Sequence, residues 1–328
     1  METEPATTER PADPSGLSAD PDAFVAELAA AVRAAEAQPP RSSGNLFLLV
    51  TMALFAITFL GDWTALDIAV LVGVVLFHEL GHAAVMMLSG YRDVRVFFIP
   101  FFGAATSGRP PPEQPFKAGL VDLAGPLPGI LLALLLFLFA PPGAVRDSAI
   151  SLLALLNVLN LVPMTPLDGG RLFDRTLVGR SPYVEIPFQI TVVTLFLFGA
   201  IAWRDIILGF LAFLSVGELA RAVKFGLPAR DLRSQNPAGW PADLEDLDAE
   251  QRRALVEVTH RETDARGPWV RAIHIHRRAA RRFPGVLGVL ALGALWLTGA
   301  VVGLGTYGAL TADPWADEPW EETAPEEP

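Results

Sequence analysis

Residues 65–88 read ALDIAVLVGVVLFHELGHAAVMML, an apolar run that is long enough to cross a membrane as one helix. Crossing a hydrocarbon core of about 30 Å takes roughly 17–25 helical residues. Inside the run stand His78, Glu79 and His82, which form the pattern H-E-x-x-H. On a helix the two histidines lie one turn apart on one face, so both imidazoles can bind one metal ion. Ionisable residues at this depth are costly and indicate a functional site, although a polar network that joins helices is the alternative.

The chain has no cysteine, so any metal must rest on histidine and carboxylate ligands. A catalytic zinc ion usually has three protein ligands and one open position for water. The remaining histidines lie in a polar segment after residue 220, so a carboxylate is expected as the third ligand. Glu79 is suited to take a proton from a metal-bound water without being a ligand. The carboxylates in or near the apolar runs are Asp67, Asp122, Asp168, Asp174 and Glu218.

Depth in the membrane favours Asp168 as the third ligand. His78 lies about 20 Å along a helix that starts at Ala65. A later helix that starts at Ala149 reaches Asn160 after about 17 Å, before prolines 163 and 166 end it. Asp168 then follows at a similar depth, in irregular backbone that can line a cavity. Asp122 is the second choice.

The stretch from Asn160 to Arg171 reads NLVPMTPLDGGR. Together with HELGH at 78–82, it resembles the site-2 protease family of intramembrane zinc metalloproteases, over about residues 65–175. The resemblance implies one zinc ion per chain, with His78, His82 and Asp168 as its ligands. It also implies Glu79 as the general base and Asn160 as a group that binds the substrate backbone or the developing oxyanion.

A third stretch, Ala124-Gly125-Pro126, resembles a further element of that family. The asparagine that often follows this tripeptide is absent, because the sequence continues as Leu127-Pro128-Gly129. Gly125 and Gly129 have the spacing that lets two membrane helices pack closely, and close packing is the favoured interpretation.

The resemblance implies an intramembrane zinc endopeptidase that cleaves transmembrane segments of membrane proteins by zinc-activated water. Membrane-tethered transcription factors and anti-sigma factors are examples of the substrates it implies, and the expected location is the plasma membrane of a prokaryote. The alternatives are a transporter or metal-permeation protein that uses the buried His and Asp cluster, and a catalytically idle scaffold. The sequence contains no repeated halves of the kind that transporters tend to have, and the intact Glu79 argues against an idle scaffold. Oligomeric state is not predicted.

Seven apolar runs are expected to cross the bilayer: 44–60, 65–88, 120–140, 149–162, 186–203, 206–219 and 286–310. The count falls to six if residues 186–219 form one helix, but Arg204-Asp205 in the middle favours a hairpin. The predicted fold is therefore an all-α polytopic membrane protein with about seven transmembrane helices. A short strand-like, membrane-associated loop follows the helix that carries H-E-x-x-H.

The charges predict how the chain is oriented and divided. With the N-terminus in the cytosol, 23 of the 25 Lys and Arg residues fall on the cytosolic side, as the positive-inside rule favours. The active site then lies toward that side. The expected parts are an acidic cytosolic tail at 1–43, a membrane protease core at 44–220, a cytosolic basic and mixed-charge segment at 221–284, a final membrane helix at 285–310 and an acidic tail at 311–328. Acidic tails on a membrane core give no sign of nucleic-acid binding.

Residues 94–107 are rich in Val, Phe and Ile and are predicted to be strand-like. An edge strand there could pair with an extended substrate, with Val94, Val96 and Phe98 as the expected contacts. An amphipathic loop on the membrane surface is the equally weighted alternative. Further along, His274 and His276 alternate as on a strand, but their arginine neighbours favour a basic patch on anionic lipid over a metal site.

Overall fold

The computed structural model describes residues 20–37, 44–60, 63–100, 103–111, 114–236, 239–260 and 268–312. Within these residues the chain is mainly helical, with one antiparallel sheet of two strands. The elements are α1 (Pro21–Glu36), α2 (Gly44–Ile57), α3 (Ala65–Leu88), β1 (Arg92–Ile99), β2 (Gly103–Arg109), α4 (Pro115–Leu123), α5 (Pro126–Phe139), α6 (Ala144–Leu161), α7 (Asp168–Thr176), η1 (Val178–Arg180), α8 (Pro182–Trp203), α9 (Ile206–Arg221), η2 (Ala222–Gly226), α10 (Leu227–Gln235), η3 (Leu244–Asp246), α11 (Ala249–His260), α12 (Pro268–Ala280) and α13 (Val286–Thr311).

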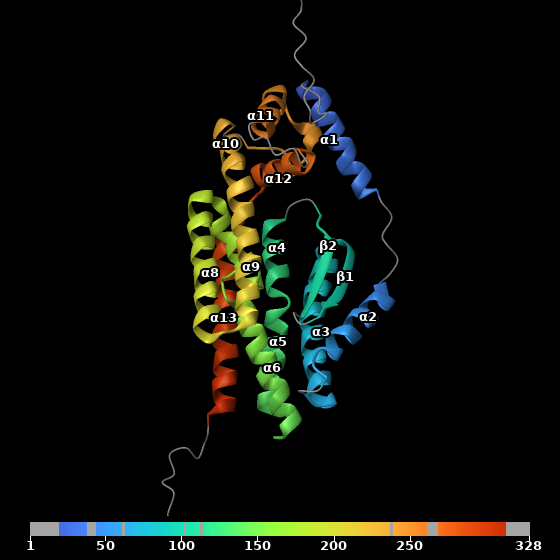
Figure 1. Cartoon of the computed structure of the whole chain (residues 1–328), viewed down its shortest axis with the longest axis vertical. Helices are drawn as coiled ribbons and strands as arrows, with labels where there is room; N and C mark the ends of the chain where they lie inside the picture. The colour runs from blue at the N-terminus through green and yellow to red at the C-terminus, as the bar shows by residue number, and fades with distance from the viewer. Residues whose placement is uncertain are drawn as a thin grey trace, which may run out of the picture.

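Five helices are long and apolar enough to cross a membrane: α3, α4 joined with α5, α6, α8 and α13. The chain is therefore an integral membrane protein. The other two expected spans, α2 with 14 residues and α9 with 16, are shorter. At about 1.5 Å per residue they measure about 21 and 24 Å, less than a hydrocarbon core. Figure 1 shows α9 running parallel to the long helices, whereas α2 lies obliquely beside β1.

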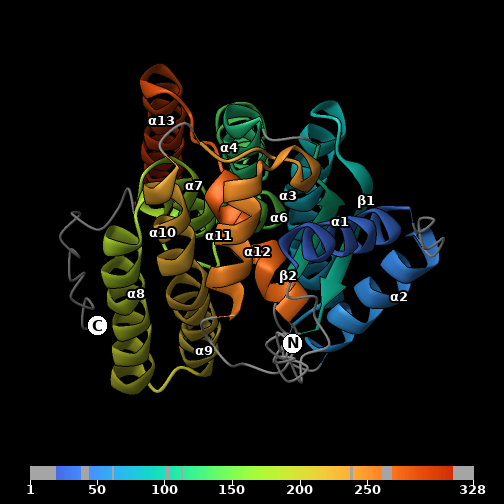
Figure 2. The same cartoon turned by 90° about the horizontal axis from the view of Figure 1, so that it is seen from above.

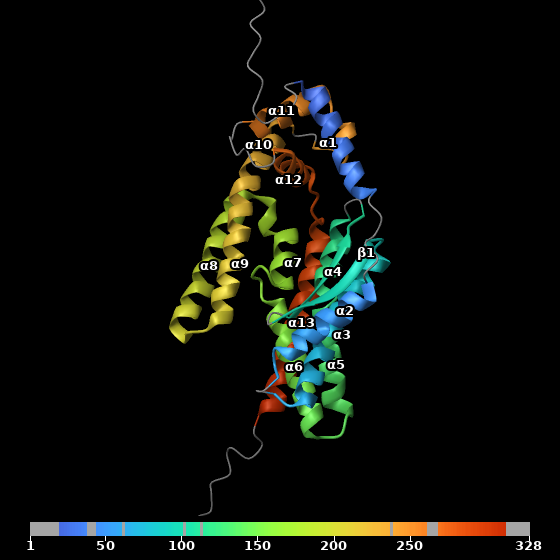
Figure 3. The same ribbon diagram turned by 45° about the vertical axis from the view of Figure 1, so that its right-hand side comes forward.

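The expected turn at Arg204-Asp205 is confirmed. Helix α8 ends at Trp203, and Arg204 adopts a left-handed conformation with φ of 54°. The Asp205 side chain then accepts a hydrogen bond from the backbone of Leu208 in the first turn of α9. In Figure 3, α8 and α9 form a hairpin that stands apart from α5 and α6.

The expected span at 120–140 corresponds to the candidate span Pro115–Phe139. It is built from two helices, α4 and α5, which are separated by a turn at Ala124 and Gly125. Pro126 occupies the first position of α5, where its missing N–H costs nothing but prevents α4 from continuing regularly. This break brings the turn against the helix that carries H-E-x-x-H.

The strand-like prediction for the loop after α3 is confirmed. Strands β1 and β2 pair antiparallel, with Val96 opposite Thr106 and Phe98 opposite Ala104. The sheet lies between two helices, because β1 packs against α2 and β2 packs against α3. The backbone N–H of Phe98 donates to Thr51 Oγ1 on α2 at 3.1 Å, which fixes the hairpin from its outer side.

A small helical domain covers one end of the membrane helices (Figures 1 and 2). This cap domain consists of α1, α10, η3, α11 and α12, and it has its own apolar core, which includes Phe24, Leu28, Leu232, Leu255 and Ile275. Residues 21–36, assigned by composition to the acidic tail, thus form part of a folded unit. Asp20 caps α1 by accepting from the Asp22 backbone at 3.1 Å. The expected acidic tail at 311–328 lies mostly outside the described residues.

The alternation of His274 and His276 does not reflect a strand, because both residues lie on α12. Residues two apart on a helix face different directions. His274 stacks on Phe225, whereas His276 is only 2% exposed and lies beside Trp240. The two imidazoles therefore do not converge on one ion.

Acidification should loosen the cap domain through His276. Burial lowers the pKa of His276 from 6.5 to about 4. Between pH 6.5 and 4, His276 therefore binds a proton in the unfolded domain but not in the folded domain. The free energy of unfolding falls as the pH drops through this range. A pKa shift of this size is worth about 3 kcal/mol. Hydrogen exchange of α12, corrected for the intrinsic rate, should rise over this range in the wild type and in the control His260→Gln, but not in His276→Phe. An equal rise in all three proteins would contradict the assignment.

Candidate metal centre

Two elements that are far apart in the sequence supply the metal-ligating side chains. His78, Glu79 and His82 lie in the middle of α3, which begins at a capping box formed by Thr64 and Asp67. Asp168 is the first residue of α7, directly after the irregular segment that follows α6. All four side chains are buried, with exposed fractions of 4% for His78, 7% for Glu79, 5% for His82 and 5% for Asp168.

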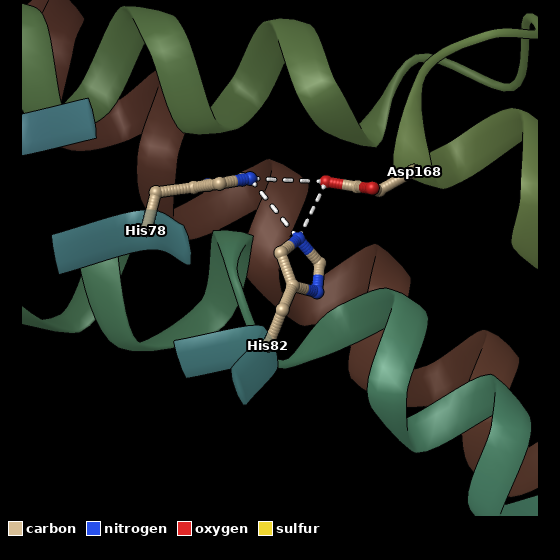
Figure 4. Close-up of side chains that lie close together, drawn as sticks. All are labelled: His78, His82 and Asp168. Atoms are coloured by element: carbon tan, nitrogen blue, oxygen red, sulfur yellow. Dashed lines mark hydrogen bonds and ion pairs between the residues drawn. The ribbon is translucent and has the colours of Figure 1, made fainter. Parts of the chain in front are cut away.

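The three expected ligands meet at one point (Figure 4). The Nε2 atoms of His78 and His82 are 3.1 Å apart. Each of them lies 3.2 Å from Asp168 Oδ2. Among the described residues these three form the one buried group of His and carboxylate side chains that could hold a metal ion.

Hydrogen bonds on the far side of each imidazole fix its tautomer. His78 Nδ1 lies 2.7 Å from Asn157 Oδ1, and His82 Nδ1 lies 2.7 Å from the Val121 carbonyl oxygen. Both partners are acceptors, because the Asn157 amide nitrogen donates to the Leu153 carbonyl. Each ring therefore carries its proton on Nδ1 and directs the Nε2 lone pair toward the other two ligand atoms.

This arrangement fits a zinc ion. Three electron-pair donors within 3.2 Å of one another in a buried site repel unless a proton or a metal ion lies among them. Zinc bound to His nitrogen and carboxylate oxygen at 2.0–2.2 Å in tetrahedral geometry separates its ligand atoms by about 3.3 Å. The separations in this chain are close to that value, and two histidines with one carboxylate form a donor set that catalytic zinc uses.

Glycines allow the backbone to approach this site. A Cβ atom on Gly125 would lie 2.4 Å from His82 Nε2 and 2.7 Å from His78 Nε2. On Gly81 it would lie 2.1 Å from the Ala124 carbonyl oxygen, so α3 touches the α4–α5 turn backbone to backbone. The close-packing interpretation of Gly125 and Gly129 is therefore confirmed, and the surfaces they approach are the two imidazoles and the Asn157 amide.

The segment before Asp168 is held from both sides. Gly169 and Gly170 lie against the backbone of residues 161–165, where a Cβ atom would come within 2.3 Å of a backbone atom. From the other side, Thr165 donates to Gln189 on α8 at 2.9 Å, and Ser215 on α9 donates to the Thr165 carbonyl at 2.8 Å. The two glycines of the LDGG sequence thus permit a tight turn, which fixes the position of the Asp168 carboxylate.

Asn157 and Thr106 contact the site but were not predicted from the sequence. Asn157 is fully buried and orients His78. Its signal was a polar amide in the middle of an apolar run, which indicates a role inside a bundle. Thr106 Oγ1 lies 2.7 Å from Glu79 Oε2 and 3.0 Å from the Glu79 carbonyl oxygen. A threonine in a strand-like loop carries no such signal, because only the tertiary fold brings it to α3.

The other expected site residues make contacts outside the cluster of His78, His82 and Asp168. The amide of Asn160 donates to the Leu156 carbonyl in its own helix at 3.1 Å. Phe98, an expected substrate contact, is 1% exposed and packs against Phe55 at a ring distance of 5.3 Å. Val94 and Val96 are half-buried in the same strand. The apolar face of β1 is used to bind α2, and β2 is the strand that reaches Glu79.

Asp122, the second choice for the third ligand, has a different partner. Its Oδ2 lies 2.7 Å from Arg175 Nε, which links α4 to α7. Helix α4 carries the Val121 carbonyl that contacts His82, and α7 carries Asp168. The Asp122–Arg175 ion pair therefore joins the helix that orients His82 to the helix that supplies Asp168.

The fold and the site together define a multi-span membrane protein with a buried cluster of two histidines and one aspartate that could hold a metal ion. A family model for Peptidase family M50 matches residues 67–145, a segment that contains H-E-x-x-H but ends before Asp168. A zinc metalloprotease of Methanocaldococcus jannaschii is 27% identical over 220 residues, which cover 61% of this chain and 63% of the relative. Stage IV sporulation protein FB of Bacillus subtilis is 33% identical over 144 residues, or 42% of this chain and 48% of the relative.

The solved structure of a site-2 protease from Methanocaldococcus jannaschii aligns with 52% of this chain and 89% of that chain, at 21% identity and a TM-score of 0.40. The family model and the curated relatives confirm the resemblance to zinc metalloproteases over the matched segments. The matched segments span about half to two thirds of the length of the two curated relatives.

Proposed function

We propose that the chain is an intramembrane zinc endopeptidase that cleaves transmembrane segments of other membrane proteins. The observation that supports this most is the buried cluster of His78, His82 and Asp168, with Glu79 directly after His78 on the mainly apolar helix α3. A buried site of this kind has no structural need for four ionisable groups.

The three clustered side chains would hold one zinc ion per chain. When bound, zinc makes water a nucleophile near neutral pH and polarises the carbonyl that is attacked. The Glu79 carboxylate accepts the proton of the attacking water and returns it to the leaving amine. Asn157 and the Val121 carbonyl keep both imidazoles in the tautomer that the ligand role requires.

Asn160 is proposed to bind the substrate backbone or the developing oxyanion. One N–H of its amide donates to the Leu156 carbonyl in the present structure, and the second N–H and the amide oxygen would serve the substrate. A helical substrate must also unwind before attack, because its carbonyls are hydrogen-bonded within the helix. The hairpin of β1 and β2 is proposed to hold the unwound segment in extended form. Strand β2 is the better candidate for this contact, because it lies on α3 beside Glu79.

The proposed orientation places the cap domain in the cytosol, and the proposed location is a prokaryotic plasma membrane. From His78 the helix α3 continues ten residues to Leu88, which is about 15 Å. From Ala65 to His78 it measures about 20 Å. The site would therefore lie toward the cytosolic side, in a membrane protease core at 44–220 that is completed by the helix at 285–310.

The direct test is Glu79→Gln in the purified full chain in liposomes. We expect about one zinc ion per chain in both proteins, and loss of cleavage in the variant by about 10²–10⁴-fold, as removal of a general base causes. Labelled casein is the probe for peptide-bond cleavage, and a synthetic single-span helix is the probe for the intramembrane role. Cleavage by the variant at the wild-type rate would contradict the proposal. Zinc flux across vesicles without cleavage by the wild type would favour a transporter.

A further inference from the structure

Strand β2 makes a hydrogen bond to the side chain that is proposed as the catalytic base. The Thr106 hydroxyl lies 2.7 Å from Glu79 Oε2 and 3.0 Å from the backbone oxygen of the same residue. A hydroxyl has one proton, and the shorter contact with an ionised carboxylate is the stronger hydrogen bond. Thr106 thus donates to the Glu79 carboxylate from an element 27 residues away in the sequence.

Alternation along the strand makes this contact specific to one position. Successive side chains of a strand point to opposite faces, so Thr106 faces α3 while Ala105 and Ser107 face away. The neighbours in β2 are otherwise small, since the strand reads GAATSGR. Thr106 is therefore the one hydroxyl of β2 that is directed at α3.

The position of Thr106 is fixed from outside the site. Val96 of β1 pairs with Thr106, and β1 is held on α2 by the Thr51–Phe98 hydrogen bond and by the contact between Phe98 and Phe55. A continuous set of contacts thus joins α2, β1 and β2 to Glu79. This gives α2, which is shorter than a membrane span, a role in supporting the site.

We propose that Thr106 is a positioning residue that holds the Glu79 carboxylate in the orientation needed for proton transfer. A glutamate side chain has three rotatable bonds, and a hydrogen bond to Oε2 selects among its conformers and leaves Oε1 to accept the proton. Misplacement of a reacting group by about 1 Å can lower a rate by about 10²-fold. The inference rests on the proposed function, because it assigns Thr106 a part in the same reaction.

Three variants separate this role from simple packing. Thr106→Val removes the hydroxyl but keeps the branched shape and the strand preference. Thr106→Ser keeps the hydroxyl. Ser107→Ala is the matched control, since it removes a hydroxyl at the adjacent position, on the opposite face of the strand. Steady-state cleavage of labelled casein by the zinc-loaded full chain gives kcat and KM, and Glu79→Gln serves as the inactive reference.

We expect Thr106→Val to lower kcat by about 10–100-fold with KM within about threefold of wild type, and Thr106→Ser to restore most of kcat. Zinc content and Tm should match the wild type. Infrared difference spectra of metal-free protein, with Glu79→Gln as the reference, should show a shifted Glu79 carboxylate stretch in Thr106→Val but not in Ser107→Ala. This second measurement does not depend on protease activity.

Unchanged kcat in Thr106→Val, while Glu79→Gln is inactive, would overturn the inference and leave the proposed function intact. A rise in KM alone would also overturn it, because it would assign Thr106 to substrate binding. An inactive wild type would instead count against the proposed function, and the infrared spectra would then decide whether Thr106 holds the carboxylate.

Discussion

Replacement of Gly125 with alanine should weaken zinc binding by more than about 100-fold, beyond the usual effect of losing a partner of a metal ligand. The added methyl group would lie 2.4 Å from His82 Nε2 and 2.7 Å from His78 Nε2, the two atoms that would bind the ion. The turn cannot retreat easily, because Ala124 already touches the backbone of Gly81. Zinc per chain after dialysis, and competition with a chelator, measure the effect.

Gly73→Ala is the matched control for this prediction. Gly73 lies on α3, and a Cβ atom there would meet no other atom within 4 Å. Alanine stabilises a helix relative to glycine by about 1 kcal/mol. Because the added methyl group also meets no neighbour, the control should bind zinc as the wild type does. Wild-type affinity in Gly125→Ala would mean that the imidazoles bind metal in an arrangement other than the one described.

The second large effect is expected from Asp168→Asn. Loss of the carboxylate leaves two neutral imidazoles and an amide, a donor set without a negative charge to offset that of the ion. Zinc affinity should fall by more than about 100-fold and casein cleavage should fall with it. Metal analysis and steady-state cleavage on the same preparation check both results.

Asp122→Asn makes the same chemical change at the other aspartate considered as a ligand. It should keep about one zinc ion per chain but lower Tm, because Arg175 loses the carboxylate that lies 2.7 Å from its Nε. If Asp122→Asn lost its zinc and Asp168→Asn kept it, the assignment of the third ligand would be reversed.

The cluster of His78, His82 and Asp168 could be predicted from the sequence because each residue lies in a local pattern. The spacing of His78 and His82 puts both imidazoles on one face of a helix, whatever the helix packs against. The position of Asp168 followed from two helix lengths and from the prolines before it. Asn157 and Thr106 could not be predicted in this way, because their contacts join α6 and β2 to α3, and nothing near them in the sequence specifies those contacts.

The packing of the cap domain could not be predicted from the sequence for the same reason. Helix α1 has a weak apolar face made mostly of alanine, which alone predicts no stable packing. Phe24 and Leu28 become fully buried only where α1 meets α11 and α12, more than 200 residues away in the sequence. The break between α4 and α5 was not predicted, although Pro126 stands at its end. The approach of Gly125 to both imidazoles depends on the tertiary structure.

X-ray absorption at the zinc edge of the purified full chain tests the central claim most directly. The account predicts about one zinc ion per chain, with two imidazole nitrogens and a carboxylate oxygen among ligands at about 2.0–2.2 Å. His82→Ala should remove one imidazole from the spectrum or the metal altogether. A protein that stays metal-free when offered zinc, or a bound ion without imidazole ligands, would contradict it.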